Sequence, residues 1–268
     1  MVLKYYAQSA DRVHWNRVWA GQRLDHLLTV AQRDPLSKIL EAHLPRSGRI
    51  IEGGCGLGQY VLHFRRLGYE VIGGDFSLAA LTVHRATSPG SPLVALDLAR
   101  LPFADCSFQA QISLGVVEHV ENGPQALLKE LHRTLCPGGT LLVSVPWVNG
   151  MRSGLAPLIR RRQARRHAGG AAFYQYAFTR REFRTVLTEA GFSVARFYPY
   201  SPGRGVRSLL SRIGRSDSSA AAPAPNGAAH PPDVGLHRLL RRLLYTPPLL
   251  WTFAHMILAV AHKPGTHD

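Results

Sequence analysis

Short apolar runs alternate with amphipathic stretches between residues 49 and 146. The runs have the length and β-branched content of buried strands, and the stretches between them repeat apolar side chains at helical spacing. Strands separated by helices indicate a parallel sheet with right-handed crossovers, so the pattern predicts an open α/β fold. The expected strands are Arg49–Glu52, Glu70–Gly74, Leu93–Leu96, Gln109–Leu114 and Thr140–Val145, and the expected helices are Gln59–Leu67, Leu78–Thr87 and Pro124–Leu135.

The segment before this core has a mostly helical pattern. Trp15 and Trp19 recur at helical spacing, and Pro45 and Gly48 mark the end of the segment. We therefore expect an N-terminal helical cap over residues 1–48.

Residues 147–178 interrupt the alternation. Their first half carries a basic cluster and their second half an aromatic group, which predicts an insertion in the α/β domain. The cluster consists of Arg160, Arg161, Arg162, Arg165 and Arg166, and the aromatic group of Phe173, Tyr174, Tyr176 and Phe178.

The α/β pattern then resumes. Thr179 and Glu182 have the spacing of a capping box, which predicts a helix that ends near Ala190. Phe192–Tyr200 and Met256–His262 are typical of strands.

The α/β domain is therefore expected to cover residues 49–200 and 251–263, with a basic insertion at 203–250 between them. Within the insertion, residues 214–233 are rich in Ala, Pro, Ser and Gly and have few large apolar side chains, so they are predicted to be disordered. Leu236–Tyr245 is predicted to form a second basic helix.

The charge of the chain is strongly unbalanced. Its 268 residues include 32 Lys and Arg against 17 Asp and Glu, a formal net charge of +15. This excess favours a polyanionic or membrane-surface partner, although an arginine-rich genome explains it equally well.

The cysteines and the apolar runs bear on the compartment. Cys55, Cys106 and Cys136 are too few and too scattered for a disulfide framework, and they contain no CxxC pair. The longest apolar run, Leu249–Ala261, is shorter than the roughly 18–20 residues that a membrane span needs. We expect a cytoplasmic protein, with peripheral contact at the inner membrane surface as an alternative.

A glycine-rich turn connects the first strand of the core to its first helix. Gly54, Gly56 and Gly58 lie there, preceded by Glu52. Glycine is required where the backbone turns with positive φ or approaches a ligand closely. The spacing differs from the dinucleotide fingerprint G-x-G-x-x-G, because residue 59 is glutamine, and no Lys-Ser or Lys-Thr follows as in a P-loop.

Two acids follow at the ends of the next two strands. Asp75 comes about 20 residues after the glycine turn, where an acid that binds ribose hydroxyls is found in such folds. Asp97 ends the third strand, where its carboxylate could accept a hydrogen bond from an adenine amino group. The carboxyl ends of parallel strands are where open α/β sheets bind ligands.

These motifs together resemble the class I S-adenosylmethionine-dependent methyltransferases, in particular the group similar to ubiquinone and menaquinone biosynthesis enzymes. The resemblance covers residues 49–146 well. In order, the motifs are Glu52-Gly53-Gly54-Cys55-Gly56-Leu57-Gly58, Asp75-Phe76-Ser77, Asp97-Leu98, Leu114-Gly115-Val116-Val117-Glu118-His119-Val120 and Leu135-Cys136-Pro137-Gly138-Gly139.

The resemblance implies a Rossmann-like sheet of seven mostly parallel strands with helices on both faces and the last strand antiparallel. It also implies that S-adenosyl-L-methionine is the cofactor. Glu52 and the glycine turn would hold its methionine part, Asp75 its ribose, Asp97 with Leu98 its adenine, and Leu114 with Gly115 its sulfonium. The full implied cofactor set is Glu52, Gly54, Gly56, Gly58, Asp75, Phe76, Asp97, Leu98, Leu114 and Gly115. Gly53 departs from the family pattern, which has an apolar residue there. This change should loosen the turn slightly but removes no ligand contact.

Methyl transfer from a sulfonium needs alignment and exclusion of water more than covalent catalysis. For a hydroxyl acceptor a general base helps, and His119 is the candidate catalytic residue, although a packing or capping role competes with this interpretation. Some related quinone methyltransferases associate a divalent metal with Glu-x-x-Glu-His. Here Gly115 replaces the first acid, which leaves Glu118 and His119, so we expect no metal.

The family places the acceptor between the N-terminal segment and the insertion at 147–178. Aromatic side chains there suit a flat or lipid-linked acceptor. The sequence predicts a small-molecule or lipid-linked acceptor and leaves the methylated atom open. The alternatives are an RNA methyltransferase, a non-catalytic partner module that binds the cofactor, and a nicotinamide-dependent oxidoreductase. Nucleic acid is disfavoured because the chain has no recognisable RNA-binding module.

Overall fold

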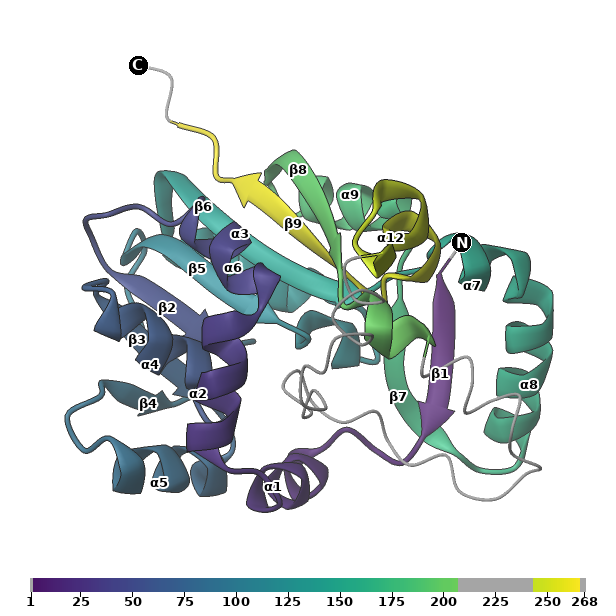
Figure 1. Cartoon of the computed structure of the whole chain (residues 1–268), viewed down its shortest axis with the longest axis horizontal. Coiled ribbons are helices and arrows are strands. Elements are labelled where there is room, and N and C mark those ends of the chain that lie inside the picture. Colours follow the sequence, from purple (N-terminus) through teal and green to yellow (C-terminus); the bar gives the residue numbers. More distant parts are fainter. Residues whose placement is uncertain (1, 207–242, 266–268) are drawn as a thin grey trace.

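The computed structural model describes residues 2–206 and 243–265. Its centre is a seven-stranded sheet with the strand order β4-β3-β2-β5-β6-β9-β8 (Figure 1). The strands of this sheet are β2 (Ile50–Gly53), β3 (Val71–Asp75), β4 (Leu93–Ala95), β5 (Phe108–Leu114), β6 (Leu135–Pro146), β8 (Ser193–Tyr200) and β9 (Met256–His262).

Strand direction confirms the expected fold. The pairs from β4 to β6 are parallel, whereas β9 runs antiparallel to both β6 and β8. The last strand is thus inserted next to β6, and the sheet is the mostly parallel Rossmann-like sheet with one antiparallel strand that the motifs implied.

Helices cover both faces of the sheet (Figure 1). The helices of the structure include α1 (Arg12–Ala20), α2 (Leu24–Arg33), α3 (Pro35–Glu41), α4 (Gln59–Arg66), α5 (Leu78–Thr87), η1 (Val117–His119), α6 (Gln125–Thr134), α7 (Gly150–Gly154), α8 (Ala156–Ala168), α9 (Arg180–Glu189) and α12 (Pro247–Phe253), of which α8 lies beside β1 (Leu3–Ala7) rather than on the sheet.

The strands alternate their side chains between two apolar cores. Ile51 packs with the buried leucines of α6 and with α9, whereas its neighbour Ile50 packs with α3 and α4 on the other face. Burial on both faces explains why these strands are nearly continuous apolar runs in the sequence. The main helix and strand predictions lie within a few residues of the structure, and the Thr179–Glu182 capping box is present.

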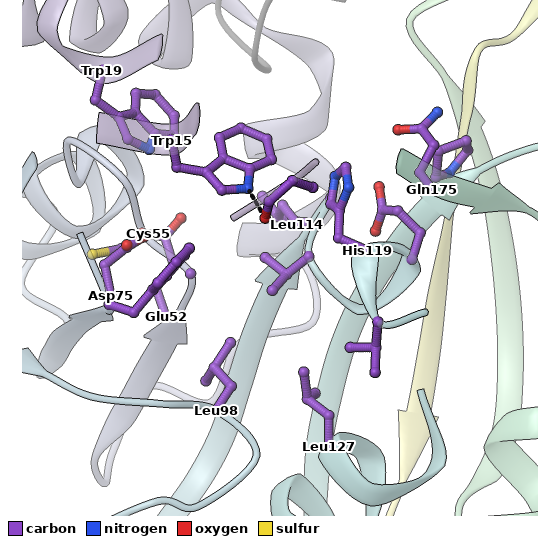
Figure 2. A pocket seen from close by; sticks show the side chains of 18 of the residues that line it. Trp15, Trp19, Glu52, Cys55, Asp75, Leu98, Leu114, His119, Leu127 and Gln175 are labelled. Atoms are coloured by element: carbon purple, nitrogen blue, oxygen red, sulfur yellow. Dashed lines mark hydrogen bonds between the residues drawn. The ribbon is translucent and has the colours of Figure 1, made fainter. Parts of the chain in front are cut away.

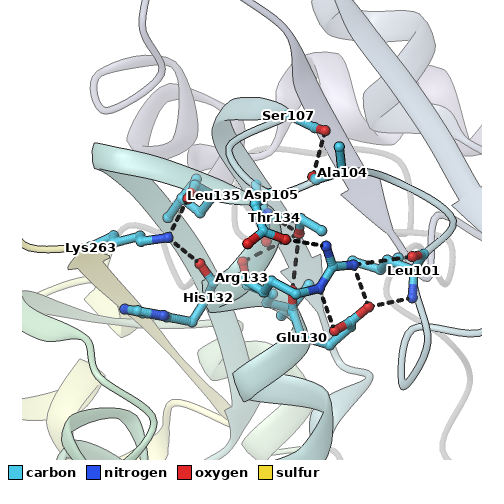
Figure 3. Close-up of polar contacts among 12 residues, drawn as sticks. Leu101, Ala104, Asp105, Ser107, Glu130, His132, Arg133, Thr134, Leu135 and Lys263 are labelled. Carbon is cyan, nitrogen blue, oxygen red and sulfur yellow. Dashed lines mark hydrogen bonds and ion pairs between the residues drawn. The ribbon is translucent and has the colours of Figure 1, made fainter.

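A charged network fixes the end of α6 to the loop before β5 (Figure 3). Arg133 donates hydrogen bonds to both carboxylate oxygens of Glu130, to Asp105 and to the carbonyl of Leu101. On the neighbouring side, the Lys263 ammonium donates to two backbone carbonyls at the α6–β6 junction.

This loop also holds a disulfide that the sequence analysis did not expect. Cys106 and Cys136 are 30 positions apart, and their sulfur atoms are joined. The backbone brings them together, because the Cys106 N–H donates to the Arg133 carbonyl at the end of α6. Cys55 is buried, with its thiol free.

The N-terminal segment differs from the expected mostly helical cap at one point. Residues Leu3–Ala7 form a strand, β1, that pairs antiparallel with β7 (Ala172–Ala177) in a separate two-stranded sheet. The register is set across about 170 positions, so periodicity within either segment could not reveal it. The aromatic group of the insertion thus lies on a strand beside the N-terminus, with α8 packed against β1 (Figure 1).

The predicted disordered stretch at 214–233 and most of the predicted helix Leu236–Tyr245 lie outside the described residues. Among the described helices, none has both the length and the apolar content to cross a bilayer.

Candidate functional site

A cavity of about 380 Å³ opens at the carboxyl ends of the central strands (Figure 2). Glu52 and Asp75 lie towards one end of it, and His119 and Gln175 towards the other. Of the predicted cofactor residues, those that line the cavity are Glu52, Gly54, Asp75, Phe76, Asp97, Leu98, Leu114 and Gly115.

The glycine turn has the backbone conformation that the sequence predicted. Gly54, Gly56 and Gly58 have φ angles of +74°, +55° and +71°, a region that other residues rarely adopt. A Cβ atom on Gly54 would lie 2.3 Å from a methyl carbon of Val116, so the backbone approaches the other wall of the cavity closely. Gly56 and Gly58 shape the turn but do not line the cavity.

Asp75 ties the end of β3 to this turn. One carboxylate oxygen accepts the N–H of Gly56 at 2.7 Å and the other accepts the N–H of Ser77 at 2.8 Å. Burial raises the pKa of Asp75, while these N–H donors oppose the shift. Each carboxylate oxygen has a second lone pair, so Asp75 can still accept hydrogen bonds from a ligand.

Glu52 is buried beside the same turn. Its Oε2 accepts the N–H of Val61 at 3.1 Å, in the first part of α4. Burial raises the pKa of Glu52 to about 8. A positively charged ligand group in the cavity would favour the ionised carboxylate.

The third strand contributes a more exposed part of the wall. Asp97 is exposed, and its Oδ1 accepts the N–H of Ala99.

Leu98 explains why glycine replaces the family's apolar residue at position 53, because a Cβ atom on Gly53 would lie 2.5 Å from a methyl carbon of Leu98. The Leu98 side chain thus occupies the space that a larger residue at position 53 would need.

The end of β5 supplies the middle of the cavity. Leu114 and Gly115 both line it, and Gly115 has a φ of +73° where the chain leaves the strand. The short 3-10 helix η1 follows and places Glu118 and His119 on the same wall.

His119 has one ring nitrogen engaged. Its Nδ1 donates to the carbonyl of Tyr174 at 2.7 Å, which leaves Nε2 as the acceptor in the neutral ring. Burial lowers the pKa of His119 to about 4. The rings of Trp15 and Tyr174 both lie 5.1 Å from it in edge-on packing.

Glu118 is the buried acid at this end of the cavity. Its side chain is 2% exposed, and among the described residues its Oε2 has no hydrogen-bond partner. Burial raises the pKa of Glu118 to about 8. In the sequence, Glu118 stands out only as half of an incomplete metal motif. In the described part of the chain no three His, Cys, Asp or Glu side chains gather into a group that could hold a metal.

Helix α1 closes the cavity from above (Figure 2). Trp15 and Trp19 stack with ring centroids 6.2 Å apart, and both line the cavity. A Cβ atom on Gly56 would lie 2.3 Å from the Trp19 ring, so this indole packs on the glycine turn itself. Asn16 and Ser77 form a side-chain hydrogen bond at 2.6 Å, which fixes α1 to the start of α5.

Further wall residues were not proposed from the sequence. Gln59 and Tyr60 directly follow the glycine turn, and Arg12 and Gln175 lie in the two segments that the family pattern placed at the acceptor. Arg204, His255 and Met256 come from the chain after β8, which the sequence did not place near the site. His255 was visible only as a polar break in the apolar run at 249–261, and Gln175 only as a neighbour of the aromatic group.

Comparisons with known proteins identify a methyltransferase domain in this chain. A family model described as a methyltransferase domain matches residues 51–143. The chain is 28% identical over 179 residues to a protein of Mycolicibacterium smegmatis named as an S-adenosylmethionine-dependent methyltransferase, covering 65% of this chain and 63% of that protein. It is 35% identical over 97 residues to a demethylmenaquinone methyltransferase of Paenarthrobacter aurescens, covering 36% of this chain and 38% of that enzyme. The chain thus covers less than two thirds of the length of either relative.

Among solved structures, the fold is similar to geranyl diphosphate C-methyltransferase from Streptomyces coelicolor. The TM-score is 0.55 with 16% sequence identity, over 97% of this chain and 91% of that one. At this identity the likeness establishes the fold.

Proposed function

Since the chain contains a class I S-adenosylmethionine-dependent methyltransferase domain, we propose that the protein transfers the methyl group of S-adenosyl-L-methionine to a small-molecule or lipid-linked acceptor. The observation that carries this proposal is the continuity of the cavity. One end has the glycine turn and two buried acids, and the other has aromatic rings with a histidine and a third buried acid.

The first end fits the cofactor. Glu52 would hold the methionine ammonium, Asp75 and Phe76 the ribose, and Asp97 with Leu98 the adenine. Leu114 and Gly115 would lie beside the sulfonium. The close approach of Gly54 to Val116 keeps this part of the cleft narrow, and any side chain at Gly54 would fill it. The bound cofactor supplies an electrophilic methyl group.

The second end fits an apolar, flat acceptor. Trp15 and Tyr174 enclose it, and burial raises the pKa of the Tyr174 hydroxyl to about 12, so that hydroxyl stays neutral. Rings of this kind enclose a flat ligand and exclude water while leaving a polar edge. A quinone-like or isoprenoid acceptor is compatible with this lining.

His119 is proposed to contact the acceptor. With Nδ1 engaged by the Tyr174 carbonyl, its Nε2 would accept a hydrogen bond and orient a hydroxyl or amine. Its lowered pKa keeps the ring neutral at physiological pH, which favours orientation over proton uptake.

Helix α8 is proposed to provide a peripheral contact with an anionic membrane surface in the cytoplasm. It carries five arginines and no acid, and Leu158 on it is 65% exposed. A lipid-linked acceptor would reach the protein from such a surface. Sedimentation with vesicles of anionic lipid tests this contact, and equal binding to neutral vesicles at any salt concentration would remove it.

Calorimetry with S-adenosylhomocysteine and mass spectrometry of cell extract incubated with the cofactor test the function. We expect binding and a product heavier by one methylene unit. Binding of NAD without S-adenosylhomocysteine would favour an oxidoreductase. Cofactor binding without any product would favour a partner module, and salt-sensitive binding of RNA with methylated RNA as product would favour the RNA enzyme.

A further inference from the structure

The acceptor end of the cavity contains a buried carboxyl group with an unused oxygen. Among the described residues, Glu118 is the only carboxyl group with a buried oxygen that lacks a hydrogen-bond partner. An unpaired buried oxygen of this kind destabilises the fold, so it calls for an explanation. Glu118 is one of the residues that line the cavity, so its carboxyl group lies at the cavity wall.

Glu52 provides the internal comparison. Both acids are buried in the same cavity wall and both have a pKa raised to about 8. The Oε2 of Glu52 accepts a backbone N–H from α4 and thereby supports the glycine turn. The Oε2 of Glu118 accepts no such backbone hydrogen bond among the described residues, so the fold does not explain why this acid is buried here. Its role is therefore expected to involve the acceptor.

Groups from several elements face Glu118. Tyr174 on β7 and Tyr200 on β8 both have pKa values raised in part by its charge. The positive charge of Arg204 acts on the same two tyrosines. His119 follows Glu118 on η1, and His255 lines the same cavity.

We propose that Glu118 accepts a hydrogen bond from the O–H or N–H group of the acceptor and takes its proton during methyl transfer. This inference rests on the proposed function. The acceptor heteroatom forms a bond to the methyl carbon, the carbon–sulfur bond breaks and its electron pair stays on sulfur. The acceptor proton moves to the carboxylate of Glu118, which becomes a neutral carboxylic acid. Charge and atoms balance, because the sulfonium loses its positive charge in the same step in which the carboxylate is neutralised by the proton.

Glu118 suits this role better than His119. A general base is most effective when its pKa lies near the working pH. Burial lowers the pKa of His119 to about 4, whereas it raises that of Glu118 to about 8. Glu118 lies three residues after Gly115, so the positive sulfonium nearby would shift its pKa downward towards neutrality.

Infrared spectroscopy tests the ionisation of Glu118 without any acceptor. The protonated carboxyl of Glu118 should give a C=O stretching band that is absent from Glu118→Gln. With S-adenosylhomocysteine, which has no sulfonium charge, the band should persist to higher pH than with S-adenosylmethionine. If the band disappears at the same pH with both ligands, the proposal is overturned, because Glu118 would not face the sulfonium.

The rate of methyl incorporation tests the proton transfer. Labelled cofactor is incubated with the lipid and small-molecule fraction of a cell extract, over a range of pH. Glu118→Gln should lower the rate about 100-fold or more, the lower end of a general-base contribution, and lose the rise of rate with pH. Glu118→Asp should recover part of both, and His119→Asn should lower the rate but keep the rise.

The exposed Glu121, three residues further on, gives the matched control. Glu121→Gln should match the parent, and affinity for S-adenosylhomocysteine should change less than about threefold in every variant if the fold and cofactor end are intact. A parent-like rate and pH rise in Glu118→Gln overturns the proposal. Failure of the parent to bind S-adenosylhomocysteine at all would instead reject the proposed function, so the two failures are distinguishable.

Discussion

The carboxylate of Asp75 accepts the backbone N–H of Gly56 at 2.7 Å and thereby joins the end of β3 to the glycine turn that follows β2. Two motifs 19 positions apart in the chain thus form one structural unit. The acid expected to bind a ribose also holds the turn expected to bind the methionine part.

This double role makes Asp75 sensitive to removal of its charge. In Asp75→Asn an amide N–H₂ would face one of the two backbone N–H groups, so one hydrogen bond is lost in a buried place. We expect unfolding stability to fall by about 1–3 kcal/mol and affinity for S-adenosylhomocysteine to fall at least about tenfold. Urea denaturation and calorimetry measure the two effects. Asp25→Asn, on the exposed surface of α2, should leave affinity unchanged.

Gly56 should tolerate alanine poorly for two separable reasons. Its φ of +55° disfavours a side chain, and the new Cβ would lie 2.3 Å from the Trp19 ring. Gly68 has a φ of +87° and open space around it, so Gly68→Ala measures backbone strain alone, of order 1 kcal/mol. We expect Gly56→Ala to lower the free energy of unfolding by more than Gly68→Ala does. Equal losses in the two variants by urea denaturation would show that Trp19 moves aside freely.

Stability should fall as the pH rises from about 6.5 to about 8. Burial raises the pKa values of Glu52 and Glu118 from 4.5 to about 8, so in this range the folded state holds protons that the unfolded state has released. The folded state binds more protons, and each group then lowers the unfolding free energy by up to about 1.4 kcal/mol per pH unit. The histidines with lowered pKa values act below about 6.5 and in the opposite direction.

Urea denaturation at several pH values measures this slope. Glu52→Gln and Glu118→Gln should each reduce it, because a neutral amide does not titrate. If the unfolding free energy of the parent protein does not change with pH in this range, both acids ionise near their ordinary pKa.

The capping box at the start of α9 should stabilise the fold without affecting the site. Thr179 Oγ1 accepts the Glu182 N–H, and the Glu182 carboxylate accepts the Thr179 N–H. Thr179→Ala should cost about 1 kcal/mol in unfolding stability, while affinity for S-adenosylhomocysteine stays the same. Thr185 is exposed on the same helix, and Thr185→Ala is the control. Thermal denaturation should show a smaller loss of stability in this variant than in Thr179→Ala.

The disulfide can be checked by counting thiols. Alkylation of the unfolded, unreduced protein should modify one cysteine, Cys55, and alkylation after reduction should modify three. If the bond is present, replacing Cys106 and Cys136 by serine should lower stability by up to about 3–4 kcal/mol, the entropic contribution for a loop of this size. Three modified cysteines without reduction would contradict the bond.

The sequence alone determined the features that depend on neighbours along the chain. The alternation of apolar runs and amphipathic stretches gave the parallel core. The positive-φ glycines, the acids at strand ends and the capping box could each be identified within about ten residues, because backbone sterics and local hydrogen bonds act over that distance.

Tertiary structure decided the features that join distant segments. The β1–β7 pairing, the packing of Trp19 on Gly56, the Cys106–Cys136 bond and the unpaired oxygen of Glu118 all depend on contacts between residues 30 or more positions apart, or on burial by such contacts. Loop closure and side-chain packing select these contacts only once the whole chain is compact, so they leave no periodic trace in either segment. The residues expected to hold the cofactor could therefore be named from local motifs, whereas the other side chains that line the cavity could be identified only in the folded chain.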